Sequence, residues 1–319
     1  MERRSVLKAG VGLGAGAFAA PAAAWAAPAP GLSAGDVAAA RRLFAAGAYT
    51  RLGEVLPLLL AAARSAEQGP AGAVRAADVW VLASQLAVKQ GRTEPAGTYA
   101  ERAGAAARRS GDPVVLAAAA RAAATPLRRT GRTDEALHLL EEARAHLTAG
   151  SRPTTAGLEA AGMAALTAAY TAAQAHRRAA AHEFVAQAEE ITHRLARRPY
   201  AAGPRGELTE AQCALYRIGI HRHLGDLDTA LAHARRLRPA LLPTAERRAR
   251  AATDTARALL DAGDAAAAFA QLRLVELAAP HEARRPSVQA LTARIAEQRP
   301  ALAGLAAYTR RTTARPSSR

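Results

Sequence analysis

Arginine is the residue with the greatest capacity for chemistry in this sequence. The chain has 319 residues, 43 of them Lys or Arg against 27 Asp or Glu, which gives a formal charge of +16 and a pI near 11.3. Only Lys8 and Lys89 are lysines. Guanidinium groups bind carboxylates and phosphates through paired N–H donors. The composition therefore indicates an acidic partner, or nucleic acid, unless the arginines simply reflect a GC-rich coding sequence with no functional demand.

Other reactive side chains are present without the spacing that catalysis or metal binding needs. The sequence has no Gly-rich phosphate loop after a strand, no nucleophile elbow and no zinc-protease motif. His221 and His223 are two residues apart and so point to different sides of a helix. Cys213 is the single cysteine, which excludes an intrachain disulfide and a cysteine-based metal cluster. We therefore expect no catalytic residues, no metal and no cofactor, and a protein that is not an enzyme.

Short turns recur along the chain and define the elements that must position the arginines. Each places a Gly, or once a His, five residues before a small or apolar residue, at spacings of 44, 40, 45, 49 and 38 residues. The turns begin at Gly47, Gly91, Gly131, His176, Gly225 and Gly263. A Gly ends one helix in a left-handed conformation, and the polar residue that follows starts the next. Repeats of this length predict stacked helical hairpins.

After the last five of these six turns, small or apolar residues recur at steps of four and three, which places them on one helix face. The sets are Ala96, Ala100 and Ala103; Ala136, Leu140 and Ala143; Ala181, Val185 and Ala188; Ala230, Ala234 and Leu237; and Ala268, Leu272 and Val275. With only 4% aromatic residues and much Ala, the helices are expected to approach closely while each buries little area.

These patterns resemble the tetratricopeptide repeat over about residues 36–300. The segment from Ala136 to Ala143 is a close match to its second helix, and Trp80, eleven residues before Gly91, falls where its first helix carries Trp. The resemblance implies an all-α protein, a right-handed α-solenoid of about six to seven tetratricopeptide-like helical hairpins. The repeats here exceed the family's 34 residues, so longer helices or looser loops are expected.

A narrower resemblance is to the C-terminal sensory half of actinobacterial helix-turn-helix (XRE-type) transcriptional regulators. It is carried by the runs from Arg42 to Tyr49, from Ala106 to Pro113 and from Ala232 to Arg236. The residues before the first repeat do not fit a helix-turn-helix domain. The resemblance implies a regulatory function without direct DNA reading.

In the repeat family, ligand groove positions lie at fixed distances before the turn. Carried onto this sequence, they give the candidates Asp78, Gln85, Lys89, Arg121, Arg128, Tyr170, Arg222, Arg250 and Arg257. The excess of basic residues implies an acidic protein or peptide partner. An alternative for Lys89, Arg128, Arg222 and the neighbouring groove position Arg129 is that they favour the last turn of a helix, where the helix dipole attracts cations. Arg121, Arg250 and Arg257 are the charges that this alternative leaves unexplained.

The remaining segments set the expected organisation. Residues 1–30 contain Arg3 and Arg4 before a mildly apolar run and read as a twin-arginine export signal, cleaved near Ala26, or as a flexible arm of a cytoplasmic protein. Their apolar run is too short for a membrane span. The repeats are expected over 31–198 and 207–308, with a Pro- and Gly-bearing break or hinge over 199–206. A disordered basic tail is expected over 309–319.

The favoured function is non-enzymatic binding of a protein or peptide segment in the concave groove, with a regulatory role. Two alternatives stay open: an exported scaffold of the cell envelope, and a nucleic-acid-associated regulator that acts through its basic surface. The sequence leaves the partner and the oligomeric state open.

Overall fold

The computed structural model describes residues 31–148, 153–197 and 206–313, and all secondary structure in these ranges is helical. Its α-helices are α1 (Ala34–Ala45), α2 (Tyr49–Ala66), α3 (Pro70–Lys89), α4 (Thr93–Ser110), α5 (Pro113–Arg129), α6 (Thr133–Thr148), α7 (Thr155–Gln174), α8 (Arg178–Ala196), α9 (Glu210–His223), α10 (Leu227–Arg236), α11 (Ala245–Asp261), α12 (Ala265–Ala278), α13 (Pro280–Ala283), α14 (Pro286–Gln298) and α15 (Leu305–Thr313). A short 3₁₀-helix, η1 (Pro239–Leu241), precedes α11. The predicted export signal and most of the predicted hinge lie outside the described residues.

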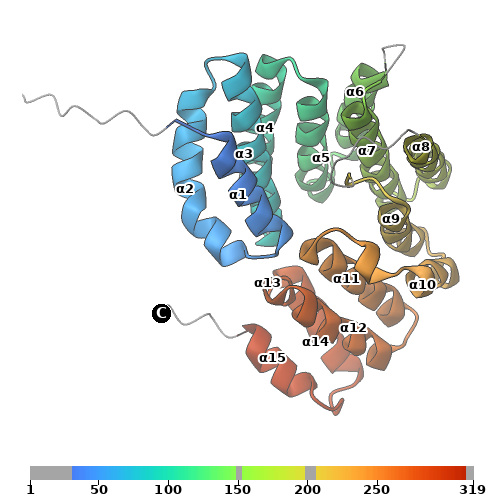
Figure 1. The fold of residues 1–319 in the computed structure, drawn as a ribbon. Helices are drawn as coiled ribbons and strands as arrows, with labels where there is room; N and C mark the ends of the chain where they lie inside the picture. Colours follow the sequence, from blue (N-terminus) through green and yellow to red (C-terminus); the bar gives the residue numbers. More distant parts are fainter. Residues whose placement is uncertain (1–30, 149–152, 198–205, 314–319) are drawn as a thin grey trace, which may run out of the picture.

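The helices form antiparallel hairpins that stack in chain order, as the all-α solenoid prediction requires (Figure 1). Within a hairpin, α3 packs on α4, α7 on α8 and α11 on α12. Between hairpins, α3 packs on α5, α5 on α7, α7 on α9 and α9 on α11, so the first helices form one continuous row. Stacking continues from α7 to α9 across the predicted break. The first helices therefore line one side of the array and the second helices the other.

Every predicted turn residue has the left-handed backbone conformation that the sequence pattern indicates. The φ angles are 71° at Gly47, 76° at Gly91 and 78° at Gly131, and 84° and 87° at Gly225 and Gly263. His176 takes the same conformation with φ of 58° and is the only non-Gly residue with positive φ in the described parts. Gly304, between α14 and α15, has φ of 81° and marks a further hairpin that the sequence pattern did not identify.

Replacing His176 by Gly is expected to raise the free energy of unfolding by about 1 kcal/mol, because Gly adopts the left-handed conformation without the steric cost of a Cβ. Urea denaturation followed by circular dichroism measures this change. Gly131→Ala is the matched control: its turn has open space around it, so only backbone strain acts, and stability should fall by a similar amount. No gain for the Gly variant would show that the turn at His176 is unstrained.

The core follows the predicted small-residue spacing. In α4, α6, α8 and α12 all three residues of each predicted set are buried, from Ala96 in the first to Val275 in the last. The set on α10 is an exception, because only Ala230 is buried. This helix ends at Arg236, shortly before Pro239, so Leu237 lies beyond its last turn.

Two further sequence expectations can be compared with the helices. The sequence predicts a disordered tail from Thr309 onward, but α15 continues to Thr313 and Thr312 is buried. The predicted start of the tail is therefore wrong by about one helical turn. Helix α3 is long and apolar enough to cross a membrane by length and composition, but most of its apolar stretch is buried inside the fold.

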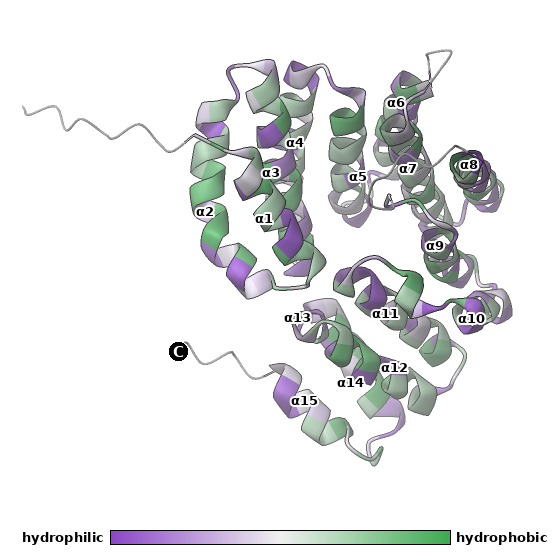
Figure 2. Cartoon of the chain, in the orientation of Figure 1, coloured by the Kyte–Doolittle hydropathy of each residue, from purple (hydrophilic) through white to green (hydrophobic). Residues whose placement is uncertain are grey.

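Figure 2 shows hydrophilic as well as hydrophobic residues on α1, α11 and α15.

The array curves so far that its two ends meet. Helix α1 packs against α11, which lies about two hundred residues later in the chain, and the two helices lie near each other in Figure 1. The turn at Gly47 approaches Ala279 so closely that a Cβ on Gly47 would lie 2.8 Å from the Ala279 Cβ. The turn at Gly91 similarly faces Pro286, the first residue of α14. The row of first helices is therefore bent around an interior space, and we call the meeting of the two ends the closure contact.

Candidate functional site

The interior side of the array holds a cavity of about 430 Å³, lined by α3, α5, α7, α9, α11 and the start of α14. We call it the central cavity. Nine of its lining residues are cations, and they come from every part of the array. They are Lys89, Arg121, Arg128, Arg129, Arg222, Arg247, Arg250, Arg257 and Arg285.

The structure brings together eight of the nine groove candidates from the sequence. Gln85, Lys89, Arg121, Arg128, Tyr170, Arg222, Arg250 and Arg257 all line the central cavity. Asp78 does not: its carboxylate pairs with the Arg41 guanidinium of α1, outside the cavity. Asp78, thirteen positions before the turn, lies near the middle of α3, where α1 of the preceding hairpin packs on that helix.

The placement of Lys89, Arg128 and Arg222 agrees with both sequence interpretations. Each is in the last turn of its helix, where the dipole favours a cation, and each lines the cavity. A location in the last turn therefore does not remove them from the site. Arg222 is held there by Asp261, whose Oδ2 accepts from Arg222 Nε at 2.6 Å.

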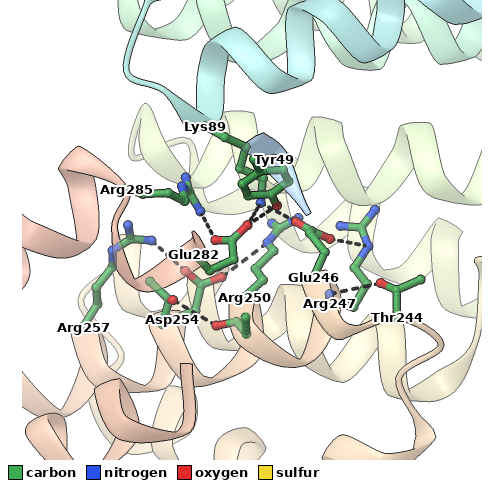
Figure 3. Close-up of polar contacts among 12 residues, drawn as sticks. Tyr49, Lys89, Thr244, Glu246, Arg247, Arg250, Asp254, Arg257, Glu282 and Arg285 are labelled. Atoms are coloured by element: carbon green, nitrogen blue, oxygen red, sulfur yellow. Dashed lines mark hydrogen bonds and ion pairs between the residues drawn. The ribbon is translucent and has the colours of Figure 1, made fainter. Parts of the chain in front are cut away.

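Helix α11 contributes a row of charges to one wall of the cavity. Arg250, Asp254 and Arg257 follow the helical spacing of three and four residues, so they share one face. Asp254 is 2.8 Å from Arg257 and 3.5 Å from Arg250, measured between nitrogen and oxygen. One buried carboxylate therefore pairs with two guanidinium groups, as Figure 3 shows, and leaves one positive charge in excess.

The closure contact places a buried ionic network at another edge of the cavity (Figure 3). Lys89 Nζ is paired with Glu246 of α11 and with Glu282 of α13, at 2.6 Å from Glu282 Oε1. Glu282 also accepts from the Tyr49 hydroxyl and, at 2.6 Å, from Arg285. The side chain of Glu282 has no exposed surface and that of Lys89 is 10% exposed.

Electrostatics holds both network carboxylates ionised. Burial alone would raise the pKa of Glu246, but Lys89 and Arg247 outweigh it and the pKa lies well below its usual range. The pKa of Glu282 is lowered in the same way, against its burial, by Lys89 and Arg285. The same burial, together with the Glu282 charge, raises the pKa of the Tyr49 hydroxyl, which remains a hydrogen-bond donor.

Two arginines at the end of α5 have no acidic partner among the described residues. Arg128 donates only to neutral oxygens, at 3.0 Å to Gln174, 3.0 Å to Thr171 and 3.1 Å to Thr125. Its guanidinium carbon lies 5.3 Å from the centre of the Tyr170 ring. Arg129 is exposed and makes no hydrogen bond or ion pair within the described parts of the chain.

The central cavity therefore carries an excess of positive charge. Its nine cations face two lining carboxylates, Glu246 and Asp254, and three more acidic partners just behind the wall: Glu282, Asp261 and Glu207. Four positive charges remain uncompensated even when all five acids are included. Burial and mutual repulsion lower the pKa of Arg128 and of Arg129, with Arg250 acting on the first and Arg285 on the second. An anion is the ligand that this arrangement would stabilise most.

Tyr216 lies under these charges and responds to them. Its ring is 4.3 Å from the Arg250 guanidinium carbon, and the residue is 4% exposed. Burial raises the pKa of the Tyr216 hydroxyl, but Arg250, Arg247 and Arg121 together outweigh burial and lower the pKa to about 7. At neutral pH the cavity thus holds a phenol that is partly ionised.

We expect a tyrosine of this protein to ionise near pH 7, seen as a rise in absorbance at the phenolate band during titration. Tyr216→Phe should remove that step, whereas Tyr308→Phe should leave it, because burial raises the pKa of Tyr308. A pKa lowered by folding stabilises the ionised, folded form. The wild type should therefore gain stability over Tyr216→Phe as pH rises from about 7 toward 10, with no difference below that window. An unchanged titration in Tyr216→Phe would contradict the assignment.

The sequence pattern missed a group of cavity residues. Tyr216, Arg247 and Asp254 lie on the same inward faces as the predicted candidates, one position or one turn away, and helical periodicity alone could have found them. Glu246 lies one turn before Arg250 on the same face of α11. In contrast, Phe44, Arg285 and Ser287 reach the cavity only through the closure contact. No local sequence signal marks them.

Of the two histidines compared in the sequence, His223 lines the central cavity, with its Nε2 3.1 Å from the Tyr170 hydroxyl oxygen. His221 and Cys213 do not line this cavity. His221 stacks on His233, with ring centres 5.4 Å apart, and lies 3.5 Å from Asp226. Burial, followed by the nearby Arg217, lowers the pKa of His233 to about 4. No group of three metal-ligating side chains occurs in the described ranges. Cys213 is buried beside Thr192, and burial raises the pKa of its thiol.

The sequence matches no known protein-family model, and no match was found among curated proteins. The functional assignment therefore depends on the cavity itself.

Proposed function

We propose that this protein is a non-enzymatic helical-repeat protein that binds an acidic segment of a partner protein in its central cavity. The observation that supports this most is the excess of positive charge: nine cations with only five nearby acids, converging on one open cavity. Cations converging in this way cost free energy through repulsion, and an anionic ligand would offset that cost. The role would be regulatory, as the resemblance to the sensory half of transcriptional regulators suggests.

The size of the cavity suits a short segment. Ligand sites typically measure about 300–1,000 Å³, and the central cavity measures about 430 Å³. That volume would accept a few residues in an extended conformation rather than a helix. Stacked helical hairpins commonly present such a ligand surface along the row of first helices.

Binding would connect the two ends of the chain. The cavity walls come from α3 and α5 on one side and from α11 and α14 on the other, so an occupant would contact both. A ligand shifts a conformational equilibrium only by its difference in affinity between the two states. An acidic segment would hold the closed arrangement because its charges would offset repulsion between the two walls.

The test is binding of a fluorescently labelled tetraglutamate peptide, compared with tetraglutamine and tetralysine, at low and at physiological ionic strength. We expect saturable binding of tetraglutamate alone, weaker but still measurable at the higher ionic strength, because partly buried charges are less screened. A triple variant with Gln at Arg121, Arg128 and Arg129 should lose the binding. These positions were chosen because removing Arg250 and Arg257 together would leave Asp254 buried without a cation.

The matched control has Gln at three exposed outer arginines, Arg51, Arg194 and Arg235, which changes the net charge equally. It should bind tetraglutamate like the wild type. Equal loss of binding in the two triple variants would show that net charge, and not the cavity, captures the peptide. Absence of tetraglutamate binding by the wild type would overturn the proposed function.

A further inference from the structure

The uncompensated charge of the central cavity is concentrated in one corner. Arg128 and Arg129, at the end of α5, are the cavity cations without an acidic partner within the described ranges. Arg129 shares the lining of the central cavity with Arg257 and Arg285 of the facing wall. Of the surrounding charges, those of Arg285 and Arg257 lower the pKa of Arg129 most. We call the region between Arg129, Arg257, Arg285 and Ser287 the arginine corner.

The facing wall of the arginine corner offers hydrogen-bond donors that no described residue uses. Arg285 Nε and Ser287 Oγ are buried atoms that have no hydrogen-bond partner in the part of the chain that the structure describes. Both residues line the central cavity. Buried donors without partners are costly, and a group bound in the corner could accept from them. Helix α14 begins beside them at Pro286 without a side-chain cap, so the positive end of its dipole adds to the same corner.

We propose that the arginine corner binds a phosphoryl group carried by the acidic segment. This inference rests on the proposed function, because it names one chemical group of the ligand in the same cavity. A phosphoryl group carries about −1.5 to −2 charges at pH 7 and three acceptor oxygens. Three guanidinium groups and a hydroxyl can surround such a group, whereas a carboxylate has one charge and two oxygens.

The aromatic residues of the cavity support the choice of a charged group over an aromatic ligand. Both the Arg128 and the Arg250 guanidinium groups lie over Tyr170, at 5.3 and 5.7 Å from the ring centre. Arg250 also covers Tyr216. These rings already serve as cation–π partners that orient the guanidinium groups. Arg128, which precedes Arg129 at the end of α5, is further fixed by its three hydrogen bonds, so one cation beside the corner is preorganised for an anion.

The experiment measures binding of three probes to the full chain: the capped peptide Glu-Glu-phosphoSer-Glu, capped tetraglutamate, and inorganic phosphate. We expect the phosphopeptide to bind roughly tenfold tighter than tetraglutamate, because the extra charge-assisted hydrogen bonds are formed with fixed donors. Inorganic phosphate should bind much more weakly than the phosphopeptide. Phosphate binding as tightly as the phosphopeptide would overturn the assignment to a group carried by a segment.

Variants separate the corner from the rest of the cavity. Ser287→Ala and Arg129→Gln should each reduce the preference for the phosphopeptide over tetraglutamate. Arg121→Gln, which removes a cavity charge paired with Glu207 outside the corner, should weaken both peptides equally and leave the preference unchanged. Equal affinities for the two peptides in the wild type would overturn the phosphoryl assignment and leave the proposed function standing. Failure of both peptides to bind would instead overturn the proposed function.

Discussion

Replacing Lys89 by Met is expected to lower the free energy of unfolding at pH 7 by about 3–5 kcal/mol, the cost of leaving buried charges without their partner. Lys89 is the only cation of α3 within the closure contact, and Glu246 and Glu282 both pair with it. Glu282 keeps Arg285 after the change, while Glu246 keeps only Arg247, at 3.5 Å. The closure contact should therefore open, which chemical denaturation and an increase in the radius of gyration by X-ray scattering would both report.

The pH dependence of this effect has a definite sign. In the wild type the pKa values of Glu246 and Glu282 are lowered, so their contribution is present above the usual value of 4.5 and is lost as pH falls through the folded-state values. Without Lys89, burial acts on both carboxyls with less opposition and raises their pKa values. The variant should therefore become relatively more stable on acidification. The difference from wild type should be largest at neutral pH and smaller near pH 4.

Two further variants test the cause. Adding Glu246→Gln and Glu282→Gln to Lys89→Met removes the unpaired charges and should recover part of the stability, since neutral groups are cheaper to bury. Arg41→Met breaks the ion pair with Asp78, in which the arginine side chain is 58% exposed, and should cost no more than about 1 kcal/mol. A loss from Lys89→Met that is as large at pH 4 as at pH 7 would mean that packing, and not charge, is what Lys89 contributes.

The local elements could be predicted from the sequence because each repeat carries its own signals. A Gly before a helix start determines the turn at Gly91 or Gly263, and the spacing of Ala and Leu determines which face of α6 or α12 is buried. The same register placed Arg121 and Arg250 on inward faces of first helices, where the structure has them. These predictions need only the geometry of one hairpin and its neighbour.

The closure contact could not be predicted in this way, because it depends on small rotations summed over all the hairpins. Glu282 and Ser287 are far in sequence from Lys89 and Arg129, and no periodic pattern connects them. Asp78 lies outside the cavity because α1 packs on α3 at the end of the array and Arg41 of α1 pairs with the Asp78 carboxylate. Sequence reasoning therefore identified most of one wall of the cavity and missed the contributions that the closure adds.

Trp80→Ala is expected to cost about 3–5 kcal/mol of unfolding free energy, the range for truncating a large buried aromatic side chain. Trp80 is 1% exposed, its indole N–H donates to Glu67 at 2.8 Å, and Arg102 lies 5.0 Å over its ring. Trp80→Phe, which keeps most of the volume, should cost less. Leu58→Ala is the matched control because Leu58, on α2, is 76% exposed, and it should change stability by no more than about 0.5 kcal/mol.

Hydrogen exchange distinguishes this loss from that of Lys89→Met, although both residues lie on α3. Trp80 belongs to the core cluster formed by α1 to α5, so its truncation should raise exchange throughout those helices. Loss of Lys89 should raise exchange mainly at the closure contact, in α13 and the first turn of α14, while the cluster around Trp80 stays protected. Adding the phosphopeptide should slow hydrogen exchange less in Trp80→Ala than in the wild type, because α3 and α5 form one wall of the central cavity. Identical exchange patterns in the two variants would mean that the ends of the array and its N-terminal core unfold as one unit, and that the closure contact is not an independently opening element.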